Sequence, residues 1–479
     1  MTAGPRLTRR GFARAAAAGA AGLALPASIA RCGGASAAAR GRVAVVGAGL
    51  AGLTAAYELH RAGWDVAVFE ARPRVGGRVW TLRSPFAQGQ HAEAGGEFID
   101  TIHTSMRRYC RQFGLPLEDV RIGADELDGL VDLAGRRGLE SEVVTPAVQA
   151  QIDRYDARLA ALADAIDPLD PVADGAALDR RTPAGLIDAV GLTGLARALV
   201  ERDLRDEYTV DPDQLSLLFV AQLEALTASL PDSGVEAFRI AGGNDQLPRA
   251  FAAELGDAIA LRAPATRIER TATGVTVTAG GTAHRADWAV VAAPLPALRS
   301  VEFAPALPAA LRAAIERLQY GVGTKTLLQY RSRWWEARGY SGDTYTDLTV
   351  GTTWEATNRQ RGRAGILLGY TSGSAGAEFT ALPPAQRIAT AAAELGELYP
   401  GSRSQLVHAR TAAWRDERYT RGTYTAYAPG QVTAYWRALR RPVGRVVLAG
   451  EHTDAFTSYM EGAVRSGRRA AAYIGRRGA

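Results

Sequence analysis

The stretch RVAVVGAGLAGLTAAYELHRAGWDVAVFE, residues 42–70, decides the fold. It predicts a short apolar strand at 43–46, a helix over 50–62 with helically spaced apolar residues, and a second buried strand at 65–69. A strand, a glycine-rich turn, a helix and another strand in this order are typical of a parallel sheet with crossover helices. The sequence therefore predicts an α/β fold that begins here.

Three glycines in the turn, Gly47, Gly49 and Gly52, carry a binding prediction. The first permits the turn, the second lets the backbone approach a pyrophosphate, and the third packs the helix on the strand. The helix N-terminus then faces the phosphates with unpaired N–H groups and the positive end of its dipole. Glu70 lies 23 residues after Gly47, where its carboxylate can accept hydrogen bonds from ribose hydroxyls. This predicts a dinucleotide site without choosing between FAD and NAD.

Two further glycine pairs favour FAD. The segment EARPRVGGR continues directly from the acid over residues 70–78, and EAGGEFI follows at 93–99. Gly-Gly pairs let the backbone run close beside a large planar ligand, and Arg78 can reach a diphosphate. An NAD site would not need these two additional glycine-containing segments. Either pair taken singly is also compatible with a surface turn.

The C-terminal segment offers a second helix terminus. LAGEHT at 448–453 reads as a strand that ends in Ala-Gly-Glu, and SYMEGAVRSG at 458–467 reads as the start of a helix near Met460. The N-terminus of this helix can face the polar edge of a flavin ring.

Together these motifs resemble the flavin-containing amine oxidases, the group of monoamine oxidase, polyamine oxidase and L-amino-acid oxidase. The resemblance extends from about residue 42 to the C-terminus, and it is specific in the first and last 60 residues of that span. It implies FAD, a two-domain fold, and oxidation of a C–N bond with O2 as acceptor. The FAD-binding residues that it implies are Gly47, Gly49, Leu50, Ala51, Gly52, Glu70, Arg72, Gly77, Arg78, Gly95, Gly96, Ala265, Gly450, Glu451 and Met460.

The chain contains a single lysine, Lys325, among 56 basic residues. A position that keeps lysine where arginine is used everywhere else is a candidate for work that needs a compact ammonium. The surrounding segment 320–328 matches that of the family's active-site lysine, which holds a water beside flavin N5. The resemblance thus implies that Lys325 orients this water and assists oxygen. The alternative is one surface lysine kept by chance.

By the same resemblance, three residues near the C-terminus are expected to belong to the substrate pocket. Thr423 stands where monoamine oxidase has the cysteine that bonds to the flavin, so FAD is expected to be non-covalent. Tyr424 and Tyr459 match the family's two aromatic cage residues, whose faces attract a cationic amine on arrival. Lys325, Tyr424 and Tyr459 are therefore the predicted catalytic residues. Ordinary packing is the alternative for the two tyrosines.

The same resemblance bears on the substrate. Many L-amino-acid oxidases carry an arginine for the substrate carboxylate where this chain has Phe98, although Arg83 or a distant arginine could serve. Asp100 falls where polyamine oxidases carry an acid that faces their tunnel. The predicted reaction is oxidation of an amine to an imine, then to aldehyde and ammonia, with O2 reduced to H2O2. An L-amino-acid oxidase giving a 2-oxo acid is the alternative, followed by a flavin desaturase or a non-catalytic flavoprotein.

Composition excludes other classes. The chain of 479 residues is 47% hydrophobic and 22% charged, which is typical of globular proteins. Five of its positive charges lie in residues 1–39, so removing them from the net +6 leaves the body nearly neutral and predicts no nucleic-acid partner. Two cysteines and six scattered histidines predict no metal site. No later segment has about 20 uninterrupted apolar residues, so no membrane span is expected.

The N-terminal segment reads as a leader. Arg9 and Arg10 are followed by Phe12 and an Ala/Gly/Leu stretch, which resembles a twin-arginine signal for proteins exported already folded around a cofactor. An extracytoplasmic or secreted protein is therefore expected, with a disordered basic tail as the alternative. The expected partners are a small-molecule amine or amino acid and O2, and a homodimer is left open.

The expected architecture has two domains after a signal peptide at 1–39. A Rossmann-like FAD-binding domain is assembled from the discontinuous segments 40–104, 236–296 and 440–479. A mixed α+β substrate-binding domain takes 105–235, where the periodicity predicts mostly helix, and 297–439, where strands mix with a helix near 384–398.

Overall fold

The computed structural model describes residues 40–120, 127–173, 175–228 and 234–477. The first predicted elements form as strand β1 (Arg42–Val46), helix α1 (Leu50–Arg61) and strand β2 (Asp65–Phe69). They open a parallel five-stranded sheet in the order β20-β13-β1-β2-β9. Its other strands are β9 (Ile259–Ala260), β13 (Trp288–Val291) and β20 (Val446–Leu448). All five strands come from the segments 40–104, 236–296 and 440–479.

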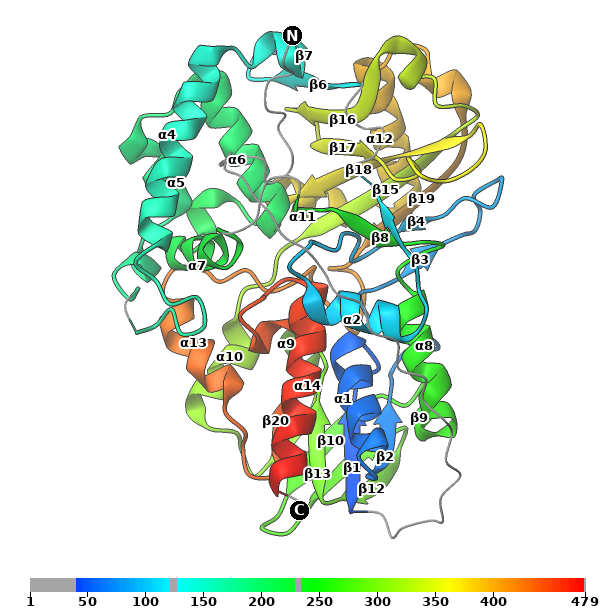
Figure 1. The fold of residues 1–479 in the computed structure, drawn as a ribbon, viewed down its shortest axis with the longest axis vertical. Coiled ribbons are helices and arrows are strands. Elements are labelled where there is room, and N and C mark those ends of the chain that lie inside the picture. The colour runs from blue at the N-terminus through cyan, green and yellow to red at the C-terminus, as the bar shows by residue number, and fades with distance from the viewer. Residues whose placement is uncertain (1–39, 121–126, 174, 229–233, 478–479) are drawn as a thin grey trace, which may run out of the picture.

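Alternate residues of β1 face two different cores. Val43 and Val45 pack with α1, whereas Ala44 and Val46 pack into the cluster on the opposite face. Both faces of the sheet are thus covered, as a parallel sheet requires. Helix α14 (Met460–Arg477) lies beside α1 on the first face (Figure 1), and a Cβ at Gly467 would lie 2.3 Å from Ala51 O. Helices α2 (Thr104–Gln112) and α8 (Gln246–Leu255) complete that layer.

A small four-stranded sheet packs against the other face. Its order is β12-β11-β10-β14, and Ile268, Val275 and Val277 share a buried cluster with Ala44 and Val46. The strands are β10 (Ala265–Arg270), β11 (Val275–Ala279), β12 (Thr282–Ala286) and β14 (Glu302–Ala304).

A seven-stranded sheet occupies the upper right of Figure 1, in the order β19-β15-β18-β17-β16-β6-β7. Strands β15 and β18 are buried along their whole length and pair antiparallel, with Lys325 opposite Tyr370. The strands are β6 (Asp128–Leu133), β7 (Arg136–Leu139), β15 (Gly323–Tyr330), β16 (Tyr340–Thr346), β17 (Thr352–Glu355), β18 (Gly365–Ser372) and β19 (Leu406–Ala413).

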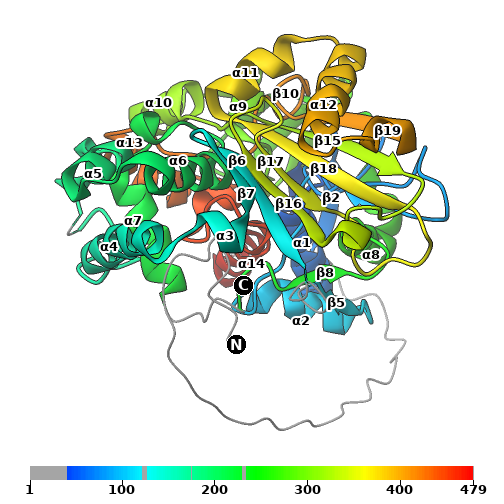
Figure 2. The ribbon, with the colours of Figure 1, turned by 90° about the horizontal axis from the view of Figure 1, so that it is seen from above.

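The hairpin β6–β7 is a departure within the segment 105–235, which is otherwise mostly helical as expected. Ala134 and Gly135 both have positive φ, 53° and 71°, and this two-residue turn matches the twist of the flanking strands. Most of that segment is nevertheless helical, and Figure 2 shows its helices gathered beside the seven-stranded sheet. They are α3 (Glu140–Val143), α4 (Pro146–Ala163), α5 (Pro183–Val190), α6 (Gly194–Tyr208) and α7 (Leu217–Thr227).

The helix starts follow local rules. Thr145, Thr182 and Ser216 cap α4, α5 and α7 by accepting a hydrogen bond from a backbone N–H in the first turn. The remaining elements are β3 (Thr81–Leu82), β4 (Ala92–Glu93), β5 (Leu117–Asp119), β8 (Phe238–Ile240), α9 (Leu295–Leu298), α10 (Ala309–Arg317), α11 (Gly373–Ala381), α12 (Pro384–Leu398) and α13 (Gln431–Arg440). The predicted α/β fold class is confirmed. Within the described ranges, no helix combines the length and apolar character needed to cross a bilayer.

Candidate functional site

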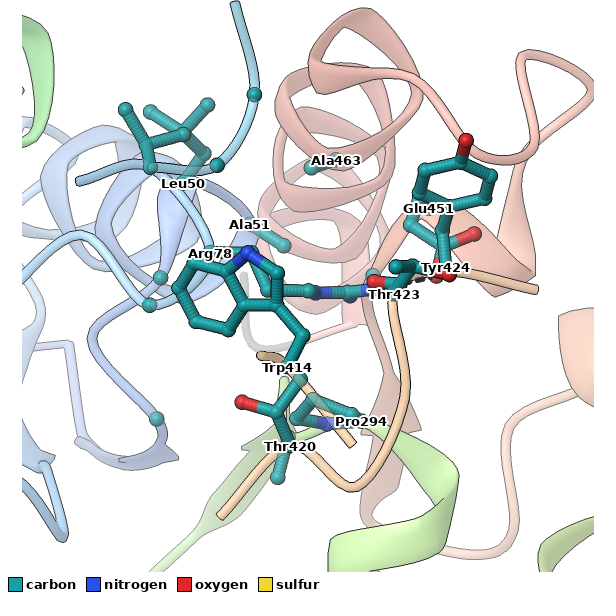
Figure 3. Close-up of a pocket in the computed structure, with 18 of the residues that line it drawn as sticks. Leu50, Ala51, Arg78, Pro294, Trp414, Thr420, Thr423, Tyr424, Glu451 and Ala463 are labelled. Carbon is teal, nitrogen blue, oxygen red and sulfur yellow. Dashed lines mark hydrogen bonds and ion pairs between the residues drawn. The ribbon is translucent and has the colours of Figure 1, made fainter. Parts of the chain in front are cut away.

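One cavity of about 480 Å³ contains nearly all of the predicted site residues. They come from distant parts of the chain, and Gly52 alone among them does not line it. The lining members are Gly47, Gly49, Leu50, Ala51, Glu70, Arg72, Gly77, Arg78, Gly95, Gly96, Ala265, Lys325, Tyr424, Gly450, Glu451, Tyr459 and Met460. Figure 3 shows part of this pocket, with Leu50 from α1 on one side and Thr423, Tyr424 and Glu451 together on another.

The start of α1 forms an open cradle. Gly49 is the N-cap of α1. Because glycine has no side chain, it gives the first N–H groups of the helix no capping bond. A Cβ at Gly49 would meet nothing within 4 Å, whereas a Cβ at Gly52 would lie 1.9 Å from Gly47 O. Gly49 thus leaves room for a ligand at the helix terminus, and Gly52 permits the contact between helix and turn.

Glu70 ties this turn to the end of β2. Its carboxylate accepts hydrogen bonds from the backbone N–H of Ala48 and of Arg72, both at 2.8 Å, and it is buried. The Arg72 guanidinium is directed to Glu417 at 2.6 Å and to Thr420. Ribose binding by Glu70 remains a prediction, since this carboxylate already holds two backbone donors.

Arg78 joins three predicted motifs. Its Nη1 lies 2.9 Å from Glu451 Oε1 and donates to Thr423 O at 2.9 Å. Glu451 also accepts from the backbone N–H of Ser458 at 3.0 Å. Burial opposes ionisation of Glu451, but Arg78, His452 and the Ser458 bond outweigh it and lower its pKa. Arg78 is thus held by a carboxylate, and its contact with a diphosphate is not shown.

These residues fit FAD. The cavity extends from Glu70 and Ala265 past the N-terminus of α1 to Lys325 and Tyr459 at the N-terminus of α14. The open cradle at Gly49 can take an anionic diphosphate at the N-terminus of α1, where the first N–H groups have no acceptor within the helix. A Cβ at Gly96 would lie 2.9 Å from Met460 Sδ, so this glycine keeps the wall flat beside α14.

Lys325 is a buried residue at the cavity wall. It is 8% exposed and lies inside β15. Its Nζ donates to Glu97 Oε2 at 2.6 Å and to Gly95 O at 3.1 Å, and it lies 5.3 Å from the centroid of the Trp354 ring. The alternative of a chance surface lysine is therefore wrong.

Three residues around this lysine were missed by sequence reasoning: Glu97 and Trp354, which contact it, and Arg239, which contacts Glu97. Glu97 is 4% exposed on its side chain, and its other oxygen, Oε1, lies 2.7 Å from Arg239 and accepts from Trp354 Nε1 at 3.0 Å. Glu97 could have been found, because it is an acid directly after a glycine pair. Arg239 and Trp354 lie in other segments and carry no comparable signal.

The two predicted cage tyrosines meet at one further residue, Glu207. Tyr459 Oη donates to the Glu207 carboxylate at 2.7 Å, and Tyr424 Oη donates to the Glu207 backbone carbonyl at 2.8 Å. Burial, the Tyr370 hydroxyl and Glu207 raise the pKa of Tyr424 well above its usual value. The Tyr424 phenol therefore stays protonated and keeps donating this bond.

We call the residues around this tyrosine pair and Lys325 the inner wall. Its members are Glu97, Phe98, Asp100, Asp206, Glu207, Glu236, Lys325, Trp354 and Tyr370. Among these described residues Lys325 is the only cation, and Glu97 neutralises it. Arg83 is bound to Asp245 at 2.8 Å and does not line the cavity, while Asp100 lines it and is buried. The inner wall is therefore acidic.

Sequence comparison places related proteins along almost the whole chain. The family of flavin containing amine oxidoreductases matches residues 50–475. AofH of Mycobacterium tuberculosis, which carries a provisional assignment as a flavin-containing monoamine oxidase, is 32% identical over 460 residues, covering 90% of this chain and 96% of that protein. Flavin-containing amine oxidase B of Sus scrofa is 28% identical, covering 90% and 85%.

Solved structures share the fold. Cyclohexylamine oxidase from Brevibacterium oxydans aligns with a TM-score of 0.83 at 28% identity, covering 91% of this chain and 99% of that one. Putrescine oxidase bound to putrescine aligns with a TM-score of 0.82 at 26% identity, covering 91% and 98%. The similarity thus extends well beyond the glycine-rich stretch at 42–70.

Proposed function

The chain belongs to the flavin-containing amine oxidoreductase family, and on this premise we propose that it is an FAD-dependent amine oxidase that uses O2. The overall reaction converts R–CH2–NH2, O2 and H2O into R–CHO, NH3 and H2O2. Bound FAD would accept two electrons and a hydrogen from the carbon beside the nitrogen, and would pass the electrons to O2. The chain's own residues then have to position the amine and keep charge and water where the reaction needs them.

One observation carries the proposal: Lys325, Tyr424 and Tyr459 meet on the cavity that Glu70 and the N-terminus of α1 also line. The two tyrosines are fixed through Glu207, so their rings are held as a pair rather than as separate surface groups. Aromatic faces attract an arriving ammonium, and an apolar slot favours the neutral amine that reacts. Lys325 places a buried positive group on the same wall.

The acidic inner wall supports an amine over an amino acid. Asp206 and Glu207 line it and attract a cationic amine. A substrate carboxylate would meet these acids, and Lys325 is already paired with Glu97 at 2.6 Å. Arg239 stands behind Phe98, 4.8 Å from its ring centroid, and is likewise paired with Glu97. Of the described residues, no arginine belongs to the inner wall, and the arginines that line the same cavity elsewhere are Arg72, Arg78, Arg418 and Arg421.

A substrate panel tests the proposal. The purified, FAD-loaded protein is mixed with primary amines, diamines and L-amino acids, and H2O2 release is measured. At least one amine is expected to exceed every L-amino acid by more than tenfold. An L-amino acid as the best substrate would establish the alternative activity. Flavin bleaching by an amine under nitrogen without peroxide in air would exclude O2 as the acceptor.

We infer that the FAD is held without a covalent bond. The supporting residue is Thr423, which lines the cavity and shares a 2.6 Å hydrogen bond with the Thr209 hydroxyl. A threonine hydroxyl offers no thiolate for attachment to a flavin. Acid precipitation of the yellow protein is expected to leave free FAD in the supernatant. Yellow colour that stays with the pellet would refute this.

Export remains a proposal from the leader, which lies outside the described residues. The support is the paired Arg9 and Arg10 followed by an apolar stretch. If the pair is read as an address, changing both to lysine traps the protein inside the cell. Unchanged secretion of the double variant would rule out a twin-arginine route.

A further inference from the structure

Glu97 is a buried carboxylate that takes no direct part in the proposed reaction. It lines the cavity directly behind Lys325 and holds three donors from three separate segments of the chain. Its two carboxylate oxygens have different partners. Oε2 faces Lys325 Nζ at 2.6 Å, and Oε1 takes Arg239 at 2.7 Å and Trp354 Nε1 at 3.0 Å.

We propose that Glu97 is a positioning residue for Lys325, which it orients at the cavity wall and keeps as an ammonium over the working pH range. The kinetic part of this inference rests on the proposed oxidase function. The protonation part does not, because it concerns the charge of the lysine itself.

The geometry explains why a carboxylate is needed here. An ammonium has three donors, and Glu97 and Gly95 O take two of those of Lys325, which sets the direction of its Nζ. Burial disfavours a charged lysine, and the guanidinium of Arg239 near the same carboxylate adds like-charge repulsion. The charge of Glu97 offsets both effects, since it contacts both cations directly.

The other ionisable groups around this site do not replace Glu97. Glu93 is bound to the Thr81 hydroxyl and to the backbone N–H of Asn244, both at 2.8–2.9 Å, and burial raises its pKa to about 7. Tyr370 lies opposite Lys325 on β18, and its hydroxyl lies 3.4 Å from that of Tyr424. Glu97 is therefore the carboxylate that the geometry assigns to the lysine.

The single lysine makes the inference directly measurable. Feeding cells lysine labelled with 13C at Cε and 15N at Nζ gives one side-chain NMR signal, that of Lys325. In the FAD-loaded wild type this signal is expected to keep its ammonium shift up to at least pH 10. A titration midpoint below pH 9 in the wild type would overturn the proposal without any variant.

Glu97→Gln supplies the contrast. The amide retains an oxygen and nearly the same shape but removes the charge, so the lysine signal is expected to titrate about 1–3 pH units lower than in the wild type. Glu93→Gln is the matched control, because it neutralises a neighbouring buried carboxylate that is hydrogen-bonded to Thr81 and Asn244 and acts on Lys325 through its charge, so a smaller shift is expected from it. Equal shifts in the two variants, or none in Glu97→Gln, would contradict a specific role of Glu97.

Stopped-flow kinetics adds the catalytic readout. Because the ammonium is lost as pH rises, reoxidation in Glu97→Gln is expected to fall more than fivefold between pH 7 and pH 9.5, while the wild-type rate stays within twofold. Reduction by substrate is expected to keep its wild-type pH profile. A shifted NMR titration with an unchanged reoxidation profile would uphold the electrostatic role and instead overturn the oxygen-assisting role of Lys325.

Discussion

Lys325→Met is expected to slow reoxidation of the reduced flavin by more than tenfold, over about 1.4 kcal/mol of barrier. The change keeps a long apolar side chain in β15 and removes the ammonium. If that ammonium assists oxygen as it acquires electrons, its loss raises the barrier of this step. If Tyr424 and Tyr459 place the amine as proposed, reduction by substrate should change less, because neither residue is altered.

The structure shows how the variant can still fold. Glu97 loses Lys325 but keeps Arg239 at 2.7 Å and the Trp354 indole at 3.0 Å, so its buried charge remains paired. Removing one partner of a buried ion pair costs about 3–5 kcal/mol when the other is left alone. With two donors remaining, the loss of stability should be smaller. Thermal unfolding of the variant measures it.

A double variant separates charge from packing. In Lys325→Met/Glu97→Gln the ammonium and the carboxylate are both removed, so reoxidation is expected to stay slow, and because Arg239 also loses the carboxylate that lies 2.7 Å away, no gain of stability over Lys325→Met is expected. Stopped-flow traces of the two half-reactions and the FAD content of each protein provide the comparison. An oxidative half-reaction of Lys325→Met within twofold of wild type would remove the lysine from the catalytic residues.

The sequence predicted the first βαβ unit closely because its signals are local. Strand β2 begins and ends at the predicted residues, and α1 ends one residue earlier than expected. Apolar periodicity and turn glycines act over a few residues, so they can be recognised in the sequence without knowledge of the tertiary structure. The hairpin β6–β7 was missed because it forms an edge of a sheet in which its neighbour β16 follows 340 − 128 = 212 residues later, counted from Asp128 to its partner Tyr340.

The site was predictable where a motif contains its own chemistry. The glycines at 47–52 belong to one turn, and Glu70 at the end of the next strand accepts from the Ala48 N–H in that turn, so these residues lie together as expected. The environment of Lys325 is different. Its carboxylate comes from residue 97, and that carboxylate's other donors come from residues 239 and 354. Only tertiary packing brings these four side chains together, and no periodicity in the chain records it.

Gly52→Ala is expected to give a protein that retains no flavin. The new Cβ would lie 1.9 Å from Gly47 O and 3.1 Å from Gly47 C, which are backbone atoms of the turn. Replacing a helical glycine by alanine gains about 1 kcal/mol in helix propensity. Overpacking against the backbone typically costs about 1–3 kcal/mol and displaces the elements involved, so the clash outweighs that gain. The N-terminus of α1 must then move away from the turn that forms the cradle.

Gly49→Ala is the matched comparison, because the same methyl group is added three residues earlier. Gly49 has φ −77° and ψ 177°, which alanine adopts without strain, and its Cβ would point into open space. The apoprotein should therefore lose no more than about 1 kcal/mol, the usual cost of alanine at an N-cap.

FAD affinity distinguishes the two positions. If the diphosphate occupies the cradle, the methyl group at residue 49 obstructs it, and the dissociation constant should rise at least tenfold, or about 1.4 kcal/mol. Flavin content, melting temperature of the apoprotein and FAD titration are measured for both variants. A Gly49→Ala protein that binds FAD as tightly as wild type would place the diphosphate elsewhere, because a ligand in contact with the end of α1 would overlap the added methyl group and bind more weakly.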